Sequence, residues 1–343
     1  MSYSVGEKKS YAWVIDSAGL QMVELIGKAE LEKQVTAFRE VLSKPSSSLT
    51  RAKDLQSIDA AARQLYAALL RPVESKLRGK KRLTIVPDGV LAYVPFEAIG
   101  GLIETHRIAY APSASISAGL RGRPVNGNHT VMAFADPSRG QADSSVMKEH
   151  LERGYAFTAL PNARTEAAAI GRLFPASKIF VGAEASEGQL KSGTSKDIRY
   201  LHFAAHGYFD GEKPERSGIV LAQESGGEDG FLQAREIAQL SLDADLVTLS
   251  ACQSGLGKVL DGEGVQGLSR AFFLAGARSV VVSLWNVNDA ATSELMRRFY
   301  AGLKSGLAKD DALRAAKLAV MKEPRWRHPY YWAPFVLQGD AGN

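Results

Sequence analysis

The chain has 343 residues, 45% of them hydrophobic and 23% charged, with a formal net charge of +5, which is typical of a globular protein with one large or two ordinary domains. Its single cysteine, Cys252, rules out an intramolecular disulfide and indicates a reducing compartment, so we expect a cytoplasmic protein. No window approaches the ~18 apolar residues of a membrane span, and the first residues lack the apolar core of a signal peptide. The densest basic cluster, RGKKR at 78–82, has no interleaved aromatic residues. We therefore expect contact with neither a membrane nor a nucleic acid.

The first part of the chain mixes strands and helices. Two apolar runs around Ser-Ala-Gly predict a β-hairpin over 10–27. A second helix is expected around 52–77, and the Gly, Pro and Asn residues of RGRPVNGN (121–128) indicate a domain boundary. We therefore divide the chain into an α+β part over 1–127 and a second part over 128–343. Four apolar residues at spacings of four, three and four predict the first amphipathic helix: Leu31, Val35, Phe38 and Leu42.

The second part alternates strands with helices. Its strands are nearly all apolar, which is typical of a mainly parallel sheet covered by helices on both faces, so the predicted fold class is α/β. The last strand, 332–339, is expected at the edge of the sheet. Ligands of such sheets bind at the carboxyl ends of the strands. The predicted strands are 130–137, 178–182, 198–206, 217–222, 244–251, 279–285 and 332–339, and the predicted helices are 163–175, 185–192, 230–240, 265–277 and two within 290–322.

Polar and aromatic residues follow three of these strands where each one ends. His206 is the last residue of one predicted strand and Gly207 follows it, Cys252 follows another strand, and Trp285 ends a third, with Asp289 four residues beyond it. Because the carboxyl ends of parallel strands meet at one edge of a sheet, we expect these residues to line one crevice.

His206 and Cys252 together have the chemistry of cysteine proteolysis. A free thiol has a pKa of ~8.5 and is little ionised at neutral pH, so a nearby histidine is needed to take its proton and then to protonate the leaving amine. The oxyanion that develops needs backbone N–H groups, which Gly207 and Cys252 could supply. Residue type and position leave a second interpretation open, in which Cys252 is a small core residue and His206 a strand-end histidine.

Two motifs near the crevice imitate binding sites. His202 and His206 have the spacing of the zinc signature H-E-x-x-H, but the general-base glutamate is missing, and we expect His202 to be a packed or hydrogen-bonded histidine. GEGVQG at 262–267 matches G-x-G-x-x-G but lies about ten residues beyond its strand, so we expect a loop that leads into a helix. Asp261 and Glu263 could rim the site or be solvated there. We expect neither a metal nor a cofactor.

Asp289 has two compatible interpretations. A carboxylate beside the crevice could hold a basic substrate side chain through a charge-assisted hydrogen bond. Aspartate is also favoured as a helix N-cap, and a predicted helix follows it directly.

Five blocks of the second part resemble, in order and spacing, the CHAT domain, a caspase-like cysteine peptidase family that is related to separase and often fused to tetratricopeptide repeats. Earlier segments such as IVPDGVLAYVPFEAI are also similar, so the resemblance covers essentially the whole chain. The five blocks are YLHFAAHG, SGIVLA, LVTLSACQSGLG, GEGVQGLSRAFFLAGARSVVVSLWNVND and HPYYWAPFVLQG.

The resemblance implies a caspase-like fold with a catalytic dyad. The family's histidine falls on His206 and its nucleophile on Cys252, and their separation of 46 residues (252 − 206) is close to the ~50 of caspases. Ser254 stands where caspases have glycine, which argues against a pocket for aspartate. In separase-like proteins the preceding region can be an inactive caspase-like subdomain, an interpretation that residues 1–127 allow.

Similarity to separase also implies substrate contacts. It places Asp289 near the pocket for the P1 residue, where it would favour arginine or lysine, and Trp285, Asp261 and Glu263 are further candidates for contact with the substrate. We therefore expect a cysteine endopeptidase that cleaves a specific protein after a basic residue. Its control would come from a regulatory partner or an upstream sensor or repeat domain, in a setting such as bacterial defence. The alternative is a catalytically degenerate caspase-like scaffold for protein interactions.

Overall fold

The computed structural model describes most of the chain. It covers residues 1–46, 50–120, 130–138, 157, 159–192, 198–208, 210, 213–224, 227–250 and 263–342, with the backbone alone at 263–266. Cys252 and Asp261 lie outside these ranges, and so does the side chain of Glu263.

The N-terminal hairpin is confirmed. β2 (Lys9–Asp16) and β3 (Gly19–Ile26) pair along their whole length, and β1 (Ser2–Ser4) adds to β2, so that the three strands form an antiparallel sheet. The helix predicted after it is α1 (Lys28–Leu42), and the four residues chosen from its spacing are all fully buried. Helical periodicity therefore identified the core-facing stripe of α1 correctly.

The second predicted helix is interrupted. α2 (Arg51–Leu65) continues into a π-helical turn over Tyr66–Leu70, a 3₁₀ turn over Arg71–Val73 and α3 (Glu74–Leu77). Pro72 lies in the 3₁₀ turn. Since proline has no N–H and its ring clashes with the preceding turn, it breaks the regular hydrogen-bond ladder there.

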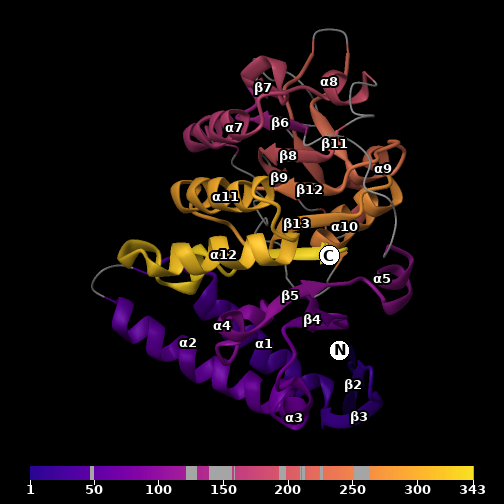
Figure 1. Ribbon diagram of the computed structural model, residues 1–343, viewed down its shortest axis with the longest axis vertical. Coiled ribbons are helices and arrows are strands. Elements are labelled where there is room, and N and C mark those ends of the chain that lie inside the picture. The colour runs from indigo at the N-terminus through magenta and orange to yellow at the C-terminus, as the bar shows by residue number, and fades with distance from the viewer. Residues whose placement is uncertain are drawn as a thin grey trace.

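The main sheet has eight strands, in the order β4-β5-β14-β13-β12-β8-β6-β7 (Figure 1). All neighbouring pairs are parallel except β13 and β14, which are antiparallel. β4, β5 and β14 therefore run opposite to the other five strands. The α/β fold class is confirmed. The strands are β4 (Arg82–Ile85), β5 (Arg107–Tyr110), β6 (Val131–Ala135), β7 (Lys178–Val181), β8 (Tyr200–Ala204), β12 (Leu246–Leu249), β13 (Ser279–Ser283) and β14 (Phe335–Gly339).

The prediction that 332–339 forms an edge strand is wrong. β14 lies between β13 and β5, and Phe335, Val336 and Leu337 are buried. Buried consecutive side chains are typical of a strand that is covered on both faces. β14 also joins β4 and β5 of the first part to the strands of the second, so one sheet crosses the expected boundary. The division into 1–127 and 128–343 stays a prediction.

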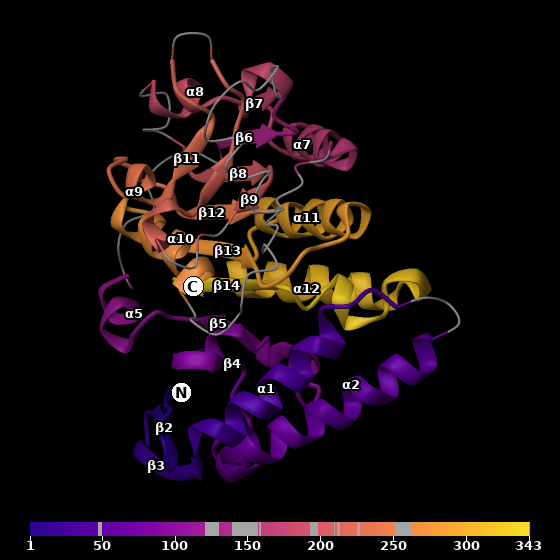
Figure 2. The same ribbon diagram turned by 180° about the vertical axis from the view of Figure 1, so that it is seen from behind.

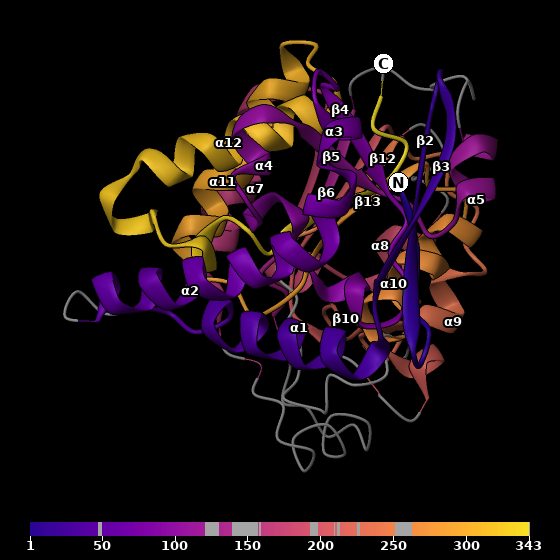
Figure 3. The ribbon, with the colours of Figure 1, turned by 90° about the horizontal axis from the view of Figure 1, so that it is seen from below.

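Helices cover both faces of this sheet, as Figure 3 shows. One face carries α7 (Pro161–Leu173), α11 (Asp289–Lys304), α12 (Lys309–Lys322) and α4 (Leu102–Thr105). The other face carries α5 (Ala114–Leu120), α8 (Glu187–Lys191), α9 (Ala234–Ile237) and α10 (Glu263–Leu274). α1 and α2 lie at one end of the molecule, beyond β4 (Figure 2).

A second, smaller sheet follows β8 directly. It contains β9 (Gly207–Tyr208), β10 (Gly218–Val220) and β11 (Phe231–Gln233), paired antiparallel in the order β11-β10-β9. The predicted strand over 217–222 is confirmed. The predicted helix over 230–240 begins instead as β11, because Phe231 and Leu232 pair with β10, and only α9 is helical.

The segment 262–267 is mostly helix rather than the expected loop, since α10 begins at Glu263. Among the helices of the described residues, none is long and apolar enough to cross a membrane.

Candidate active site

His206 lies between the two sheets, after the end of β8 and directly before β9. It is 4% exposed, and its ring packs at a tilt against Phe157, with 5.8 Å between the ring centroids. The backbone N–H of Val220 donates to the carbonyl oxygen of His206 at 2.8 Å. The backbone bond from β10 therefore holds the main chain of His206, and Phe157 packs against its imidazole.

Gly207 pairs with Ile219 across β9 and β10. Since Val220 bonds to His206, the residue before Gly207, the pair Gly207–Ile219 is of the non-hydrogen-bonded type. In such a pair the N–H points away from the partner strand. This direction fits the oxyanion role expected for Gly207, which stays a prediction.

β8 and β12, the strands that precede His206 and Cys252, are parallel neighbours. Phe203 pairs with Leu249, and the N–H of Ser250 donates to the carbonyl oxygen of Phe203 at 2.8 Å. His206 comes three residues after Phe203, and Cys252 three residues after Leu249. The predicted separation of 46 residues is therefore equal to the register offset of the two strands (249 − 203).

Trp285 follows β13 and is buried. Its indole N–H donates to the carbonyl oxygen of Tyr330 at 3.2 Å, and its own carbonyl oxygen accepts from the Ser283 hydroxyl at 2.5 Å. The indole bond ties Trp285 to the segment before β14, and the second bond ties it to the last residue of β13. Its contact with a substrate stays a prediction.

Asp289 is the first residue of α11, but it is not the N-cap. That position belongs to Asn288, whose side-chain oxygen accepts from the N–H of Ala291 at 3.0 Å. The Oδ2 atom of Asp289 accepts from the backbone N–H of Asn162 at 3.0 Å and from its side-chain amide at 2.8 Å. Since Asn162 is the second residue of α7, Asp289 joins the N-terminal ends of α11 and α7.

Asp136, which the sequence reasoning missed, follows β6 at the same edge of the sheet as His206. Its φ of 44° makes it the one left-handed residue other than glycine in the described part of the chain. Its carboxylate accepts from the N–H of Leu160 at 3.1 Å and from the Arg164 guanidinium at 2.6 Å. Strain of this kind concentrates at functional sites. The signal in the sequence was again a polar residue directly after an apolar strand.

His202 is hydrogen-bonded and fully buried, as expected. Its Nε2 lies 2.7 Å from Oε1 of Glu166 and its Nδ1 lies 3.1 Å from the Tyr300 hydroxyl. Both ring nitrogens thus have protein partners, which argues against a zinc-ligand role for His202.

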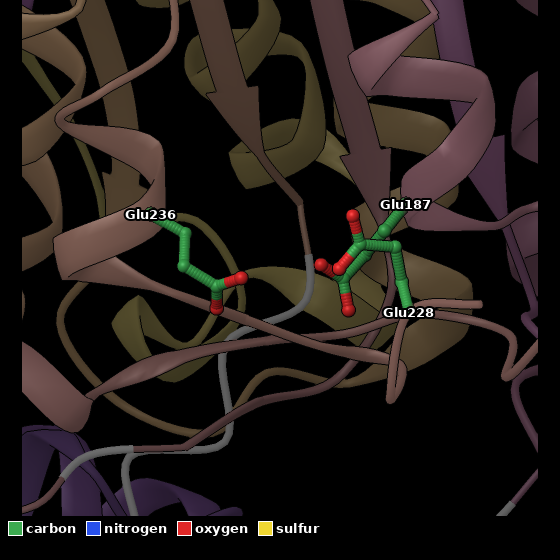
Figure 4. A group of neighbouring side chains, drawn as sticks. All are labelled: Glu187, Glu228 and Glu236. Atoms are coloured by element: carbon green, nitrogen blue, oxygen red, sulfur yellow. The ribbon is translucent and has the colours of Figure 1, made fainter.

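Glu187, Glu228 and Glu236 are the one cluster of potential metal ligands within the described ranges (Figure 4). The Lys191 ammonium lies 2.8, 2.9 and 3.0 Å from their respective carboxylates. Burial raises the pKa of Glu187 to about 7, although Lys191 opposes this shift. The cluster is an ion-pair network centred on Lys191. Its ammonium group occupies the position between the carboxylates where a metal ion would bind.

A cavity of about 680 Å³ lies between α5 and α10. Residues that follow β4 and β5 line it, including Pro87 and Pro112, together with Phe273 and Leu274 of α10. Because β4 and β5 run opposite to β8, their carboxyl ends lie at the other edge of the sheet from His206. This cavity is therefore separate from the predicted crevice.

Known proteins resemble this chain in sequence and in structure. In Homo sapiens and Mus musculus, tetratricopeptide repeat protein 28 is 28% and 27% identical to this chain over 328 and 334 residues. Each match covers 81% of this chain and 13% of the relative, so the chain spans a small part of those proteins.

Among solved structures, separase of Saccharomyces cerevisiae in complex with securin is 14% identical, with a TM-score of 0.46 and coverage of 92% of this chain and 20% of that one. The Arg-specific cysteine proteinase gingipain R is 9% identical, with a TM-score of 0.48 and coverage of 92% and 74%. The family model of the CHAT domain matches residues 59–340, which is most of the chain. The chain therefore belongs to the CHAT domain family.

Proposed function

We propose that this chain is a cysteine endopeptidase in which Cys252 is the nucleophile and His206 the general base and acid. The Cys252 thiolate attacks the scissile carbonyl carbon after its proton passes to His206. His206 then protonates the leaving amine as the C–N bond breaks, which leaves an acyl-enzyme. Water, deprotonated by His206, hydrolyses this thioester, and the thiol is restored.

The observation that carries this proposal is the register of β8 and β12. The parallel pair Phe203–Leu249 lies equally far, by residue count, from His206 and Cys252. In a parallel sheet, the segments that follow paired residues of neighbouring strands begin side by side, at the carboxyl ends of those strands. This register supports a dyad more directly than composition or motif.

The oxyanion hole belongs to the same proposal. The N–H groups of Gly207 and Cys252 would stabilise the negative charge that forms on the carbonyl oxygen. The pairing of Gly207 with Ile219 supports this role, because it directs the N–H of Gly207 away from β10.

For specificity, we propose that the P1 residue is arginine or lysine and that Asp289 binds it. Both hydrogen bonds from Asn162 use Oδ2. Within the described part of the chain, Oδ1 of Asp289 has no hydrogen-bond partner, so it could accept from a substrate cation. Asp261 and Glu263 would add negative charge at the rim, and Trp285 would form the wall.

We further propose that a protein partner or an attached repeat domain controls cleavage. The curated relatives carry tetratricopeptide repeats in their name, and this chain corresponds to 13% of their length.

A role in bacterial defence is part of the same proposal. It is tested by comparing how phages plate on bacteria that express the wild type or Cys252→Ala. Equal plating would contradict that role without affecting the proposed chemistry.

The decisive experiment for the chemistry compares the wild type with Cys252→Ala and His206→Ala. An acyloxymethyl ketone probe with a P1 arginine should label the wild type at Cys252, and either substitution should abolish both labelling and peptide cleavage. Cleavage that persists in Cys252→Ala would falsify the assignment of Cys252 as the nucleophile. If the folded wild type binds peptides but neither cleaves them nor reacts with the probe, the degenerate scaffold is the correct interpretation.

A further inference from the structure

A fully buried carboxylate joins the two strands that precede the proposed dyad. Oε1 of Glu166 on α7 lies 2.7 Å from Nε2 of His202 on β8 and accepts from the Ser250 hydroxyl, directly after β12, at 2.5 Å. One oxygen atom therefore binds a residue of β8 and the residue that directly follows β12. Ser250 is two residues before Cys252, and His202 is four residues before His206.

The network continues on the other side of the imidazole. Nδ1 of His202 lies 3.1 Å from the Tyr300 hydroxyl of α11, and that hydroxyl donates to Oγ1 of Thr248 at 3.1 Å. Thr248 belongs to β12 and pairs with His202 in the sheet. β8 and β12 are thus linked twice through side chains, in addition to their backbone ladder.

All members of this network are 2% exposed or less: Glu166, His202, Thr248, Ser250 and Tyr300. Around them the layer between the sheet and its helices is apolar, with Phe174 and Tyr200 packed edge-on against the Tyr300 ring. Burying a carboxylate and an imidazole is costly unless both are hydrogen-bonded, and apolar residues of similar volume often stabilise a core equally well. Stability alone therefore does not explain why this polar set occupies the layer.

We propose that Glu166 is a positioning residue that acts through His202 and Ser250. It fixes β8 against β12 at their carboxyl ends, so that the segments of His206 and Cys252 leave the sheet at a constant relative position. This inference rests on the proposed dyad. It adds α7, a helix without a residue in the dyad, to the machinery that keeps the dyad in order.

The test uses the reactivity of the only cysteine. Alkylation of the full chain by iodoacetamide, followed by mass spectrometry, reports on Cys252 alone. In the wild type the rate constant should rise with pH around an inflection below the ordinary thiol value of ~8.5, because His206 favours the thiolate. Ser250→Ala removes one hydroxyl and should move the inflection upward, with a loss of about tenfold in rate at pH 7. Glu166→Leu should have a larger effect, whereas Glu166→Gln keeps an acceptor at Oε1 and should retain most of the wild-type profile.

Ser279→Ala is the matched control. Ser279 is also a fully buried strand serine, and its hydroxyl donates to the carbonyl oxygen of Asp245 at 2.6 Å near the start of β13. The Ser279→Ala variant should lower the melting temperature about as much as Ser250→Ala does. It should leave the pH dependence of Cys252 alkylation unchanged. If both serine variants lower the melting temperature and neither moves the profile, the network is only structural and the inference is wrong. If the wild-type inflection is ordinary and His206→Ala does not change it, the dyad itself fails, and the inference fails with it.

Discussion

Asn162 donates to the Oδ2 atom of Asp289 through both its backbone N–H and its side-chain amide, at 3.0 and 2.8 Å. The carboxylate proposed to bind a basic P1 side chain is therefore held in place by a neighbouring helix. Its orientation does not depend on a substrate being present.

Asp289→Asn should separate charge from shape at this position, because asparagine can still accept from Asn162. We expect kcat/KM for a peptide with P1 arginine to fall about 10- to 100-fold, since a hydrogen bond to a charged group contributes about 1.5–3 kcal/mol. The kcat/KM for a peptide with an apolar P1 residue should change little. Asn162→Ala is the comparison: it keeps the backbone N–H bond to Oδ2 and the charge of Asp289 and removes only the side-chain amide. It should lower stability by about 1 kcal/mol and reduce cleavage after arginine far less than Asp289→Asn does. Preference of the wild type for a large apolar P1 over arginine would refute the role of Asp289.

A buried ion pair at the other end of the sheet should contribute strongly to stability. The ammonium of Lys309 lies 2.6 Å from Oδ1 of Asp245, and both side chains are 6% exposed or less. Burial alone would raise the pKa of Asp245, but Lys309, Arg199 and Arg278 hold it below its ordinary value. Lys309→Ala should therefore destabilise the chain by about 3–5 kcal/mol, because a buried carboxylate loses its main partner.

Urea unfolding measures this loss, and Lys9→Ala provides the comparison. Lys9 also forms an ion pair, with Glu24 at 2.9 Å, but both side chains are more than half exposed. Removing it should cost less than about 1 kcal/mol. Similar losses for the two variants would contradict the importance assigned to burial.

Local pattern predicted most of the elements, whereas their neighbours in space had to be observed. The stripe from Leu31 to Leu42 identified the buried face of α1, because helical spacing is a property of the sequence itself. The edge position of β14 was predicted wrongly because the apolar run FVL is the same whether β13 and β5 or solvent lie beside it. Strand order is set by packing between distant segments, such as β14 against β5.

The candidate site was predictable to a similar extent. Residues directly after apolar strands, such as His206, could be chosen because ligands meet the carboxyl ends of parallel strands. Glu166 was missed, although it follows the buried Ala163 by three residues and precedes the buried Ile170 by four. A carboxylate on the apolar stripe of a helix is the signal that marks it. Its partners could not be predicted, because they come from β8 and from the end of β12.

The stability of the chain should depend on Glu187 between pH 4.5 and 7. Because burial raises the pKa of this fully buried residue to about 7, the folded state holds the proton more tightly than the unfolded state does. The free energy of unfolding contributed by Glu187 should therefore be greatest below its ordinary pKa and fall as the pH rises to 7, by an amount on the order of 3 kcal/mol. Glu187→Gln should flatten this part of the plot of unfolding free energy against pH. The variant should therefore become more stable relative to the wild type as the pH rises.

Urea unfolding at pH 5, 6, 7 and 8 checks the slope. The control is Glu184→Gln, an exposed residue just before α8, which should leave the slope of the wild type unchanged. A wild-type stability that instead rises from pH 5 to 7, with no difference in slope for Glu187→Gln, would contradict the prediction.

Gly276 connects α10 to β13 and should tolerate no side chain. Its φ is +108°, and a Cβ there would overlap the carbonyl oxygen of Leu242. That oxygen belongs to backbone that is itself held in place, because the N–H of Leu242 donates to the carbonyl oxygen of Ala275 at 2.6 Å. Gly276→Ala therefore combines an unfavourable φ with a clash that no rotamer can relieve, and we expect a loss of more than about 3 kcal/mol.

Gly306, between α11 and α12, isolates the contribution of φ. Its φ is +86°, but nothing lies within 4 Å of a Cβ built there, so Gly306→Ala should cost only about 1 kcal/mol. Thermal unfolding of the two variants compares them directly. If Gly276→Ala costs no more than Gly306→Ala, the contact between Gly276 and Leu242 is looser than the structure shows. A larger loss at Gly276 would mean that the end of α10 is held tightly against the backbone before β12. Since α10 is the next helix after Cys252, the Cys252 segment then leads into a helix whose far end is fixed.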